Sequence, residues 1–121
     1  MKKIRTVDDS KTALMVTTMA LKRTPYLVTT AADGEEALAK ALADPPDLIV
    51  LDVVMPKLDG LETCRRLRSR EETKNIPIIM LTTRGESENV KVGFDAGCTD
   101  YMTKPVNATE LLSRIRSLLG A

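Results

Sequence analysis

The chain has 121 residues, of which 43% are hydrophobic and 29% are charged, and its formal net charge is +1. This length and balance predict one folded domain over residues 1–121 and exclude a disordered chain. The near-zero charge gives no electrostatic basis for direct nucleic-acid binding, and the absence of histidine excludes Ser-His and Cys-His catalysis and histidine-ligated metals.

Short apolar runs alternate with longer segments of helical period along the whole chain. In chain order, the predicted strands are Ile4–Val7, Leu27–Ala31, Leu48–Leu51, Ile78–Leu81 and Tyr101–Thr103. The predicted helices are Ser10–Arg23, Glu35–Ala43, Leu58–Arg68, Ser87–Ala96 and Asn107–Leu119. Such alternation predicts an α/β domain in which helices cover both faces of a parallel sheet.

Local signals agree with the limits of these helices. Ser10 is placed to cap the first helix, and Asp33-Gly34 predicts a turn before the second. Pro45-Pro46 prevents the second helix from continuing into the third strand. In the last helix, Arg114 and Arg116 are predicted to face away from a single apolar stripe.

Thr6 does not fit the pattern of the first strand, and neither does Arg5, because a parallel strand buried on both faces is normally apolar. The simplest interpretation is that the Arg5 side chain lies at the mouth of the sheet and reaches water. The pattern assigns no function to either residue.

The two cysteines, Cys64 and Cys98, are far apart in sequence, whereas zinc sites need closely spaced ligand pairs. The two residues leave a disulfide open without implying one, and we expect buried or half-buried thiols in a reducing cytosol. The first ten residues lack the apolar core of a signal peptide, and the apolar stretch Leu48–Met55 is too short to span a bilayer. We therefore expect a cytoplasmic protein without membrane insertion.

Polar side chains follow four of the five predicted strands. They are Asp8-Asp9-Ser10, Asp52, Thr82-Thr83 and Thr103-Lys104-Pro105. In an open parallel sheet, ligands bind beyond the carboxyl ends of the strands, so these groups are expected at one rim. Clustered carboxylates suit Mg²⁺, and a carboxylate is also a competent nucleophile toward phosphorus. A lysine and a hydroxyl could then stabilise the transferring oxygens.

Each of these residues also has an ordinary structural interpretation. Asp8 and Asp9 could simply cap the first helix, and a lysine before a proline usually lies in a solvated loop. Other isolated acids are interpreted as turn or cap residues, namely Asp33, Asp59 and Asp100. The coincidence of acids, hydroxyl and lysine at strand ends favours a functional site.

The chain resembles the receiver domains of two-component response regulators, chemotaxis regulators among them, from Lys3 to Leu119. The resemblance lies in VDDS, PDLIVLDVVMPKLDG, IPIIMLTT and DYMTKP. It implies a flavodoxin-like (βα)5 three-layer sandwich with strand order 2-1-3-4-5. It also implies a phosphoacceptor switch in phosphorelay signal transduction, not an enzyme.

The resemblance assigns a role to each acid. Asp52 would accept the phosphoryl group from the phosphohistidine of a sensor histidine kinase or phosphotransfer protein. Asp9 would bind Mg²⁺, or Mn²⁺ in its place, directly, and Asp8 would act largely through water. Asp52 and the backbone carbonyl of Val54 would complete the protein ligands.

The resemblance also implies how the switch works. Thr82 and Lys104 would bind the phosphoryl oxygens, and the peptide before Pro105 would be cis. Tyr101 would move inward as Thr82 moves toward the phosphate. The altered surface would comprise the fourth helix, fifth strand and fifth helix, and would bind a downstream protein or an output domain through residues including Lys91, Tyr101 and Arg114.

In this family, the positions of Val54, Thr83 and Arg84 tune how long the phosphoryl group survives. Thr83 is bulkier than the alanine or glycine common there. We hypothesise that Thr83 and the apolar Val54 slow attack by water, so that Thr83→Ala would hydrolyse faster.

Three alternatives stay open at this point. A phosphatase of the haloacid dehalogenase type also uses an aspartate nucleophile but needs a second aspartate two residues later, where this chain has Val54. A flavodoxin binds phosphate after its first strand, where Asp8-Asp9 would repel it. A pseudo-receiver would bind partners without phosphorylation. Whether the domain stands alone or belongs to a longer regulator also stays open.

Overall fold

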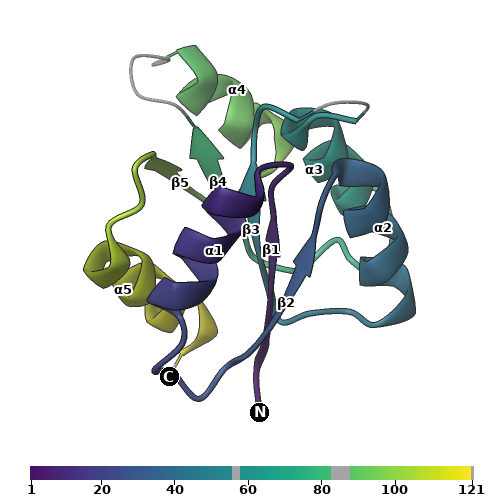
Figure 1. The fold of residues 1–121 in the computed structure, drawn as a ribbon. Helices are drawn as coiled ribbons and strands as arrows, with labels where there is room; N and C mark the ends of the chain where they lie inside the picture. The colour runs from purple at the N-terminus through teal and green to yellow at the C-terminus, as the bar shows by residue number, and fades with distance from the viewer. Residues whose placement is uncertain (56–57, 83–87, 121) are drawn as a thin grey trace.

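A computed structural model describes residues 1–55, 58–82 and 88–120 (Figure 1). Its strands are β1 (Lys3–Val7), β2 (Leu27–Ala31), β3 (Leu48–Asp52), β4 (Ile78–Thr82) and β5 (Asp100–Thr103). Its helices are α1 (Lys11–Ala20), α2 (Gly34–Ala43), α3 (Gly60–Arg68), α4 (Glu88–Ala96) and α5 (Ala108–Leu119). Each predicted strand and helix is present with limits that differ by a few residues, and the predicted start of the fourth helix at Ser87 lies outside the described residues.

The strands form one parallel sheet in the order β2-β1-β3-β4-β5. Parallel neighbours cannot be joined by tight hairpins, so each connection crosses a face of the sheet through a helix. Helices α1 and α5 cover one face, and α2, α3 and α4 cover the other (Figure 1). The predicted flavodoxin-like α/β fold, with its strand order, is confirmed.

The core has one part on each face of the sheet. On one face, Ile49 and Leu51 of β3 join a cluster with α2, α3 and α4; on the other, Leu48 and Val50 join a cluster with α5. Because β3 is buried on both faces, its sequence is apolar without alternation. Cys64 and Cys98 are buried free thiols, as predicted. Among the helices of the described ranges, none is both long and apolar enough to cross a membrane.

Side-chain caps fix where four helices begin. In each, the oxygen of the capping residue accepts a hydrogen bond from a backbone N–H in the first turn, and the caps are Ser10, Asp33, Asp59 and Asn107. The predicted cap at Ser10 and the capping interpretation of Asp33 and Asp59 are confirmed. Helix α3 begins at Gly60, two residues later than predicted, because Asp59 is its cap.

The predicted position of Arg5 at the mouth of the sheet is wrong. The residue is 2% exposed and lies in the middle of β1, beside Thr29 of β2. Its Nε donates a hydrogen bond to Thr29 Oγ1 over 3.0 Å. A polar neighbour on the edge strand β2 therefore holds the guanidinium inside the fold.

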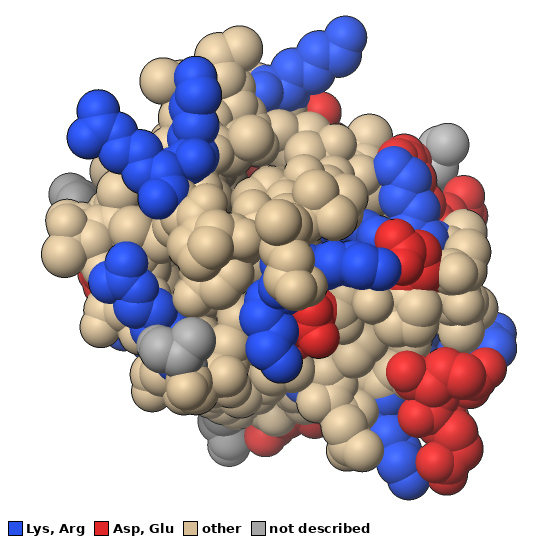
Figure 2. Space-filling model, turned by 90° about the horizontal axis from the view of Figure 1, so that it is seen from below, with Lys and Arg blue, Asp and Glu red and all other residues tan. Residues whose placement is uncertain are grey.

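Charges of both signs share the end of the molecule at which the strands begin. Figure 2 shows Lys and Arg side chains spread over this end, whereas most of its Asp and Glu side chains lie toward one side, next to some of the basic ones. Neither sign covers the whole face, in keeping with the net charge of +1.

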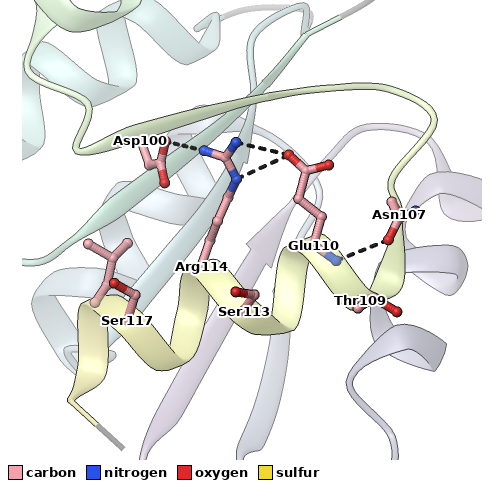
Figure 3. Close-up of a pocket in the computed structure, with 8 residues that line it drawn as sticks. Asp100, Asn107, Thr109, Glu110, Ser113, Arg114 and Ser117 are labelled. Atoms are coloured by element: carbon pink, nitrogen blue, oxygen red, sulfur yellow. Dashed lines mark hydrogen bonds and ion pairs between the residues drawn. The ribbon is translucent and has the colours of Figure 1, made fainter.

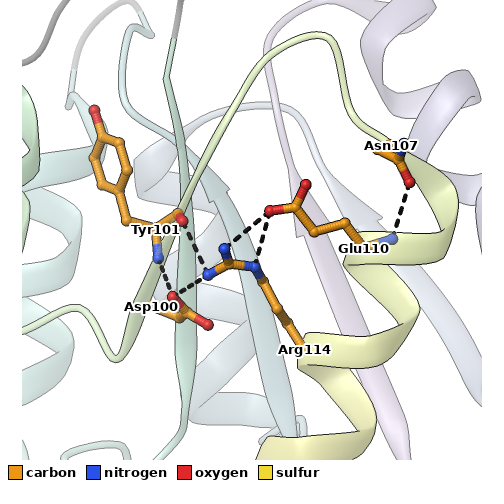
Figure 4. Close-up of polar contacts among 5 residues, drawn as sticks. All are labelled: Asp100, Tyr101, Asn107, Glu110 and Arg114. Atoms are coloured by element: carbon orange, nitrogen blue, oxygen red, sulfur yellow. Dashed lines mark hydrogen bonds and ion pairs between the residues drawn. The ribbon is translucent and has the colours of Figure 1, made fainter.

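Asp100 also departs from the predictions, and it pairs with Arg114, which lies outside the apolar cluster of α5 as predicted. Both line a pocket along α5 (Figure 3), where Arg114 is half-buried and lies between Asp100 and Glu110 (Figure 4). Its guanidinium pairs with Asp100 and with Glu110, the latter at 2.9 Å, and also donates to the carbonyl of Tyr101. Asp100 opens β5 and is not a helix cap. Arg114 thus ties α5 to β5, whereas Arg116 is exposed, as predicted.

Arg68 connects α3 to two segments that are distant in sequence. Its guanidinium donates to the carbonyls of Ile76 at 2.6 Å, Gly97 at 2.7 Å and Lys74 at 3.2 Å. It also donates to Thr99 Oγ1 at 3.1 Å. This side chain therefore satisfies acceptors before β4 and between α4 and β5.

We expect Arg68→Met to lower the free energy of unfolding by about 2–3 kcal/mol, because several acceptors lose a charged donor at once. The control is Arg66→Met on the same helix, whose exposed side chain pairs with Glu62; it should change stability by no more than about 0.5 kcal/mol. Urea unfolding measures both. Equal losses for the two variants would contradict this role of Arg68.

Candidate functional site

Three carboxylates meet at the carboxyl ends of neighbouring strands. Asp8 follows β1 directly and Asp52 ends β3, which pairs with β1 in parallel register. One carboxylate oxygen each from Asp8, Asp9 and Asp52 lies within 4.8 Å of the others. Asp8 and Asp52 are each 5% exposed, whereas Asp9 is exposed. The acids that the sequence singled out therefore form one cluster, two of them at its buried floor.

Lys104 joins this cluster from the far side of β4. Its Nζ lies 2.8 Å from Asp8 Oδ2 and 3.1 Å from Asp52 Oδ1. The Lys104-Pro105 peptide is cis, as the resemblance implied. The alternative of a solvated loop lysine is thus wrong, because the ammonium bridges two buried acids.

The electrostatics of the cluster follow from this crowding. Burial, and next the charge of Asp8, raise the pKa of Asp52 to about 6, although Lys104 opposes the shift. Burial alone would lower the pKa of Lys104, but hydrogen bonds to Asp8 and Asp52 outweigh it and raise that pKa. Three acids facing one lysine leave the site with an excess of negative charge.

The backbone at Gly60 lies tightly against the end of β3. Gly60 N donates to the Val53 carbonyl over 2.8 Å, and a Cβ on Gly60 would lie 2.2 Å from the Asp52 carbonyl oxygen. Only glycine permits this approach. Gly60 was not predicted as a site residue, although the Asp59-Gly60 pair before a helix was the available signal.

The family model of the response regulator receiver domain matches residues 4–116. The chain belongs to this family. Receiver domains of response regulators are signalling phosphoacceptors of two-component systems and not enzymes, and they partner histidine kinases. The resemblance drawn from the sequence motifs is confirmed.

Relatives of this receiver domain include both regulators and kinases. The alkaline phosphatase synthesis transcriptional regulatory protein PhoP of Bacillus subtilis is 46% identical over 118 residues, which are 98% of this chain and 48% of that protein. Chemotaxis protein CheY4 of Vibrio cholerae is 39% identical, with a TM-score of 0.91 and coverage of 98% of this chain and 99% of that one.

A third relative is the receiver domain of a sensor histidine kinase from Pseudomonas aeruginosa, whose crystal structure holds a magnesium ion in the active site cleft. It is 31% identical, with a TM-score of 0.91 and coverage of 99% of this chain and 98% of that one. This receiver domain spans about half the length of the curated regulators it matches, such as PhoP.

The acidic cluster of this receiver domain suits a divalent metal. Its ligand atoms are carboxylate oxygens, the donors that hard divalent cations prefer. Burial is the first cause of the raised pKa of Asp52, and repulsion from the charges of Asp8 and Asp9 adds to it, while Lys104 opposes the shift. A cation among Asp8, Asp9 and Asp52 would remove that repulsion. Together with the magnesium-bound relative, the cluster indicates a divalent metal site.

The other residues predicted to belong to the site differ in how deeply they are buried. Thr82 ends β4 and is 2% exposed, Val54 is 60% exposed, and Tyr101 is half-buried against the core. The Tyr101 hydroxyl is buried and has no hydrogen-bond partner within the described ranges. Thr83 and Arg84 lie outside the described residues, as does the side chain of Lys91.

Proposed function

We propose that Asp52 accepts a phosphoryl group from the phosphohistidine of a sensor histidine kinase or phosphotransfer protein. The observation that carries this proposal is Lys104 Nζ bridging Asp8 and Asp52 at 2.8 and 3.1 Å within a cluster of three acids. A carboxylate nucleophile beside a fixed cation is what phosphoryl transfer needs, since positioning and charge stabilisation dominate that reaction.

In the proposed step, a carboxylate oxygen of Asp52 attacks phosphorus and forms a P–O bond. The P–N bond to the donor imidazole breaks, and its electron pair stays on the nitrogen, which takes up a proton. The product is an acyl phosphate on Asp52. Because Asp52 lies at the end of a strand buried on both faces, its side chain is held in place for this attack.

The proposed metal is Mg²⁺, or Mn²⁺ in its place, held by Asp8, Asp9, Asp52 and the carbonyl of Val54. When bound, it supplies positive charge that offsets the acids and the transferring oxygens. Asp8 also accepts a hydrogen bond from Ser10 N over 3.0 Å, which fixes its carboxylate at the start of α1. This bond supports a role for Asp8 in a preorganised site.

The proposed switch begins with Lys104 and Thr82, which would bind the phosphoryl oxygens. Charge-assisted hydrogen bonds contribute about 1.5–3 kcal/mol each, and moving a two-state element from 1:99 to 99:1 takes about 5.5 kcal/mol. Two such bonds therefore approach the required free energy. Tyr101 would respond by moving inward as Thr82 moves.

The proposed output surface is formed by α4, β5 and α5, including Lys91, Tyr101 and Arg114. Arg114 links α5 to Asp100 at the start of β5 and also pairs with Glu110 on its own helix, which holds its guanidinium in place (Figure 4). Arg114 also donates to the backbone carbonyl of Tyr101 over 3.2 Å, so this network and the switch residue lie on the same strand. The surface would bind a downstream protein or an output domain, without direct contact to nucleic acid.

We also propose that Val54, Thr83 and Arg84 set the lifetime of the phosphoryl group. The exposure of Val54, at 60%, supports this, since an apolar side chain there would meet water approaching Asp52. We further propose a cytoplasmic location and a single receiver domain over residues 1–121, which a longer regulator could contain.

The experiment that tests the proposed function measures the intact mass of the chain after incubation with a small acyl phosphate or phosphoramidate donor. We expect a gain of one phosphoryl group with Mg²⁺ and none with a chelator. A chain that stays unmodified at saturating Mg²⁺, or that is modified equally with the chelator, would overturn the proposal.

A further inference from the structure

Strand β2 contributes no residue to the proposed phosphoacceptor site, yet the turn that follows it packs against the chain segments that do. At the end of β2, the Ala31 carbonyl accepts a hydrogen bond from Asp8 N over 3.2 Å. Three residues later, Gly34 opens α2 and lies buried against the start of α3, which follows β3 and Asp52. The turn from β2 to α2 therefore lies against both segments that carry the acids.

Gly34 leaves no room for a side chain. A Cβ at this position would lie 2.2 Å from Thr63 Oγ1 and 2.5 Å from the carbonyl oxygen of Leu58. Both distances are far shorter than the roughly 3.5 Å at which non-bonded heavy atoms make favourable contact. The Gly34 backbone is not in the left-handed region, in contrast to Gly97 and Gly120. Space, and not backbone conformation, therefore requires glycine here.

Neither neighbour of Gly34 can move aside on its own. Thr63 is fully buried, and its Oγ1 donates a hydrogen bond to the Asp59 carbonyl over 2.7 Å. A β-branched side chain in a helix also has few rotamers to choose from. The Leu58 oxygen belongs to the backbone, and its side chain is buried as well. A methyl group on Gly34 must therefore displace the start of α3 together with the residues before it.

The start of α3 is in turn held against the end of β3. Gly60 N donates a hydrogen bond to the Val53 carbonyl over 2.8 Å, and the Gly60 Cα lies so close to β3 that a Cβ would be 2.2 Å from the Asp52 carbonyl oxygen. Backbone is here in direct contact with backbone. A displacement of the start of α3 therefore reaches Asp52 and its neighbours, including the carbonyl of Val54 that is proposed to bind the metal.

We propose that Gly34 is a positioning residue for the divalent metal. Its lack of a side chain lets α2 lie close enough to fix the start of α3, and Gly60 passes this constraint to the backbone of Asp52 and Val54. An uncharged residue outside the acidic cluster thus sets the affinity for Mg²⁺. This inference rests on the proposed function, since Mg²⁺ at Asp8, Asp9 and Asp52 is the ligand whose affinity is concerned.

Titration of Mg²⁺ into metal-free wild type and Gly34→Ala, followed by nuclear magnetic resonance, tests this proposal. Before metal is added, the amide signals of Val53 and Gly60 should differ between the two chains. Gly34→Ala should then bind Mg²⁺ about tenfold more weakly, as is typical when the residues that orient metal ligands are changed. The Mg²⁺ concentration that gives half-maximal phosphoryl uptake from a small acyl phosphate should rise by the same factor, while uptake at saturating Mg²⁺ stays close to wild type.

Gly93→Ala is the matched control. Gly93 is a buried glycine within α4, so the change to alanine raises helix propensity as it does in α2. Its Cβ would meet the end of a flexible side chain, Met80 Sδ, at 3.1 Å, and no atom of the acidic cluster. Gly93→Ala should therefore leave Mg²⁺ affinity unchanged.

A second pair of variants keeps the test decisive if Gly34→Ala does not fold. Thr63→Ala removes the shorter of the two overlaps, so the double variant Gly34→Ala/Thr63→Ala retains only the one with the Leu58 backbone. It should bind Mg²⁺ more weakly than Thr63→Ala alone. Equal Mg²⁺ affinity within either pair, with wild type binding Mg²⁺, would overturn this inference alone. A wild-type chain that binds no Mg²⁺ would overturn the proposed function together with it.

Discussion

Asp52→Asn is expected to abolish phosphoryl uptake and, in the absence of metal, to stabilise the fold at neutral pH. Asparagine keeps the shape of the side chain but has no carboxylate oxygen to attack phosphorus. It also removes a buried negative charge that lies beside Asp8. A general loss of structure would reduce both activity and stability, so opposite changes in the two quantities identify a functional charge.

The difference in the free energy of unfolding between Asp52→Asn and wild type should grow as the pH rises. The pKa of Asp52 rises from 3.8 to about 6 on folding, so the folded chain binds the proton more tightly than the unfolded chain. The stabilisation from this proton is complete below about pH 4 and is lost as the pH rises through about 6. Two pKa units correspond to about 3 kcal/mol, so Asp52→Asn should gain up to that amount over wild type by pH 8.

Urea unfolding at pH 4 and pH 8 measures this effect, with and without Mg²⁺. Wild type and Asp52→Asn should be similar at pH 4 and separate at pH 8, and saturating Mg²⁺ should favour wild type. Asp59→Asn provides the control, because Asp59 is an exposed helix cap and asparagine also caps well. A wild-type chain that is more stable than Asp52→Asn at pH 8 without metal would contradict the electrostatic description of the site.

Lys104→Met is expected to slow phosphoryl uptake by roughly 10²–10³-fold while strengthening metal binding. The ammonium lies within 3.1 Å of both Asp8 and Asp52, so its removal takes away the cation proposed to stabilise the transferring oxygens. The same removal leaves the acids more negative, and a divalent cation then meets less competing positive charge. Loss of transfer with retained metal binding separates this role from a merely structural one.

Uptake from a small phosphodonor gives the rate, and calorimetric titration with Mg²⁺ gives the affinity. Lys74→Met serves as the control, since Lys74 pairs with Glu71 at the surface and should leave both quantities unchanged. If Lys104→Met accepted phosphoryl groups at the wild-type rate, the proposed contribution of Lys104 to transfer would be wrong.

The strands of the sheet could be predicted well, because the spacing of apolar residues along a strand follows from which of its faces are buried. The runs at Leu48–Leu51 and Ile78–Leu81 are apolar at every position, and both strands proved to be buried on both faces. Helix starts followed from short-range chemistry, as at Ser10 and Asp33, where a side-chain oxygen caps the next turn.

Polar pairs between distant segments were harder to predict. Arg114 was expected to face away from the apolar stripe of α5, but its pairing with Asp100 on β5 was not predicted, because a helical pattern carries no information about a charge on a neighbouring strand. Arg5 was expected to reach water, whereas Thr29 on an edge strand accepts its hydrogen bond. In both cases the partner is one that only the tertiary arrangement supplies.

The residues of the candidate site could be predicted from the sequence, but the distances and contacts between them could not. The strand ends indicated that Asp8, Asp52 and Lys104 share one rim, and the fold brings them together. The sequence could not show that Lys104 reaches across β4 to bridge both acids, because that depends on strand order and on the length of the side chain. The close approach of Gly60 to the Asp52 carbonyl was likewise a property of the folded loop.

The most direct test of the phosphoacceptor proposal locates the transferred group. The chain should be incubated with a histidine-phosphorylated donor domain and Mg²⁺, digested under conditions that preserve acyl phosphates, and sequenced by tandem mass spectrometry. We predict a single phosphoryl group on Asp52. A phosphoryl group on any other residue, with Asp52 unmodified, would contradict the proposed function.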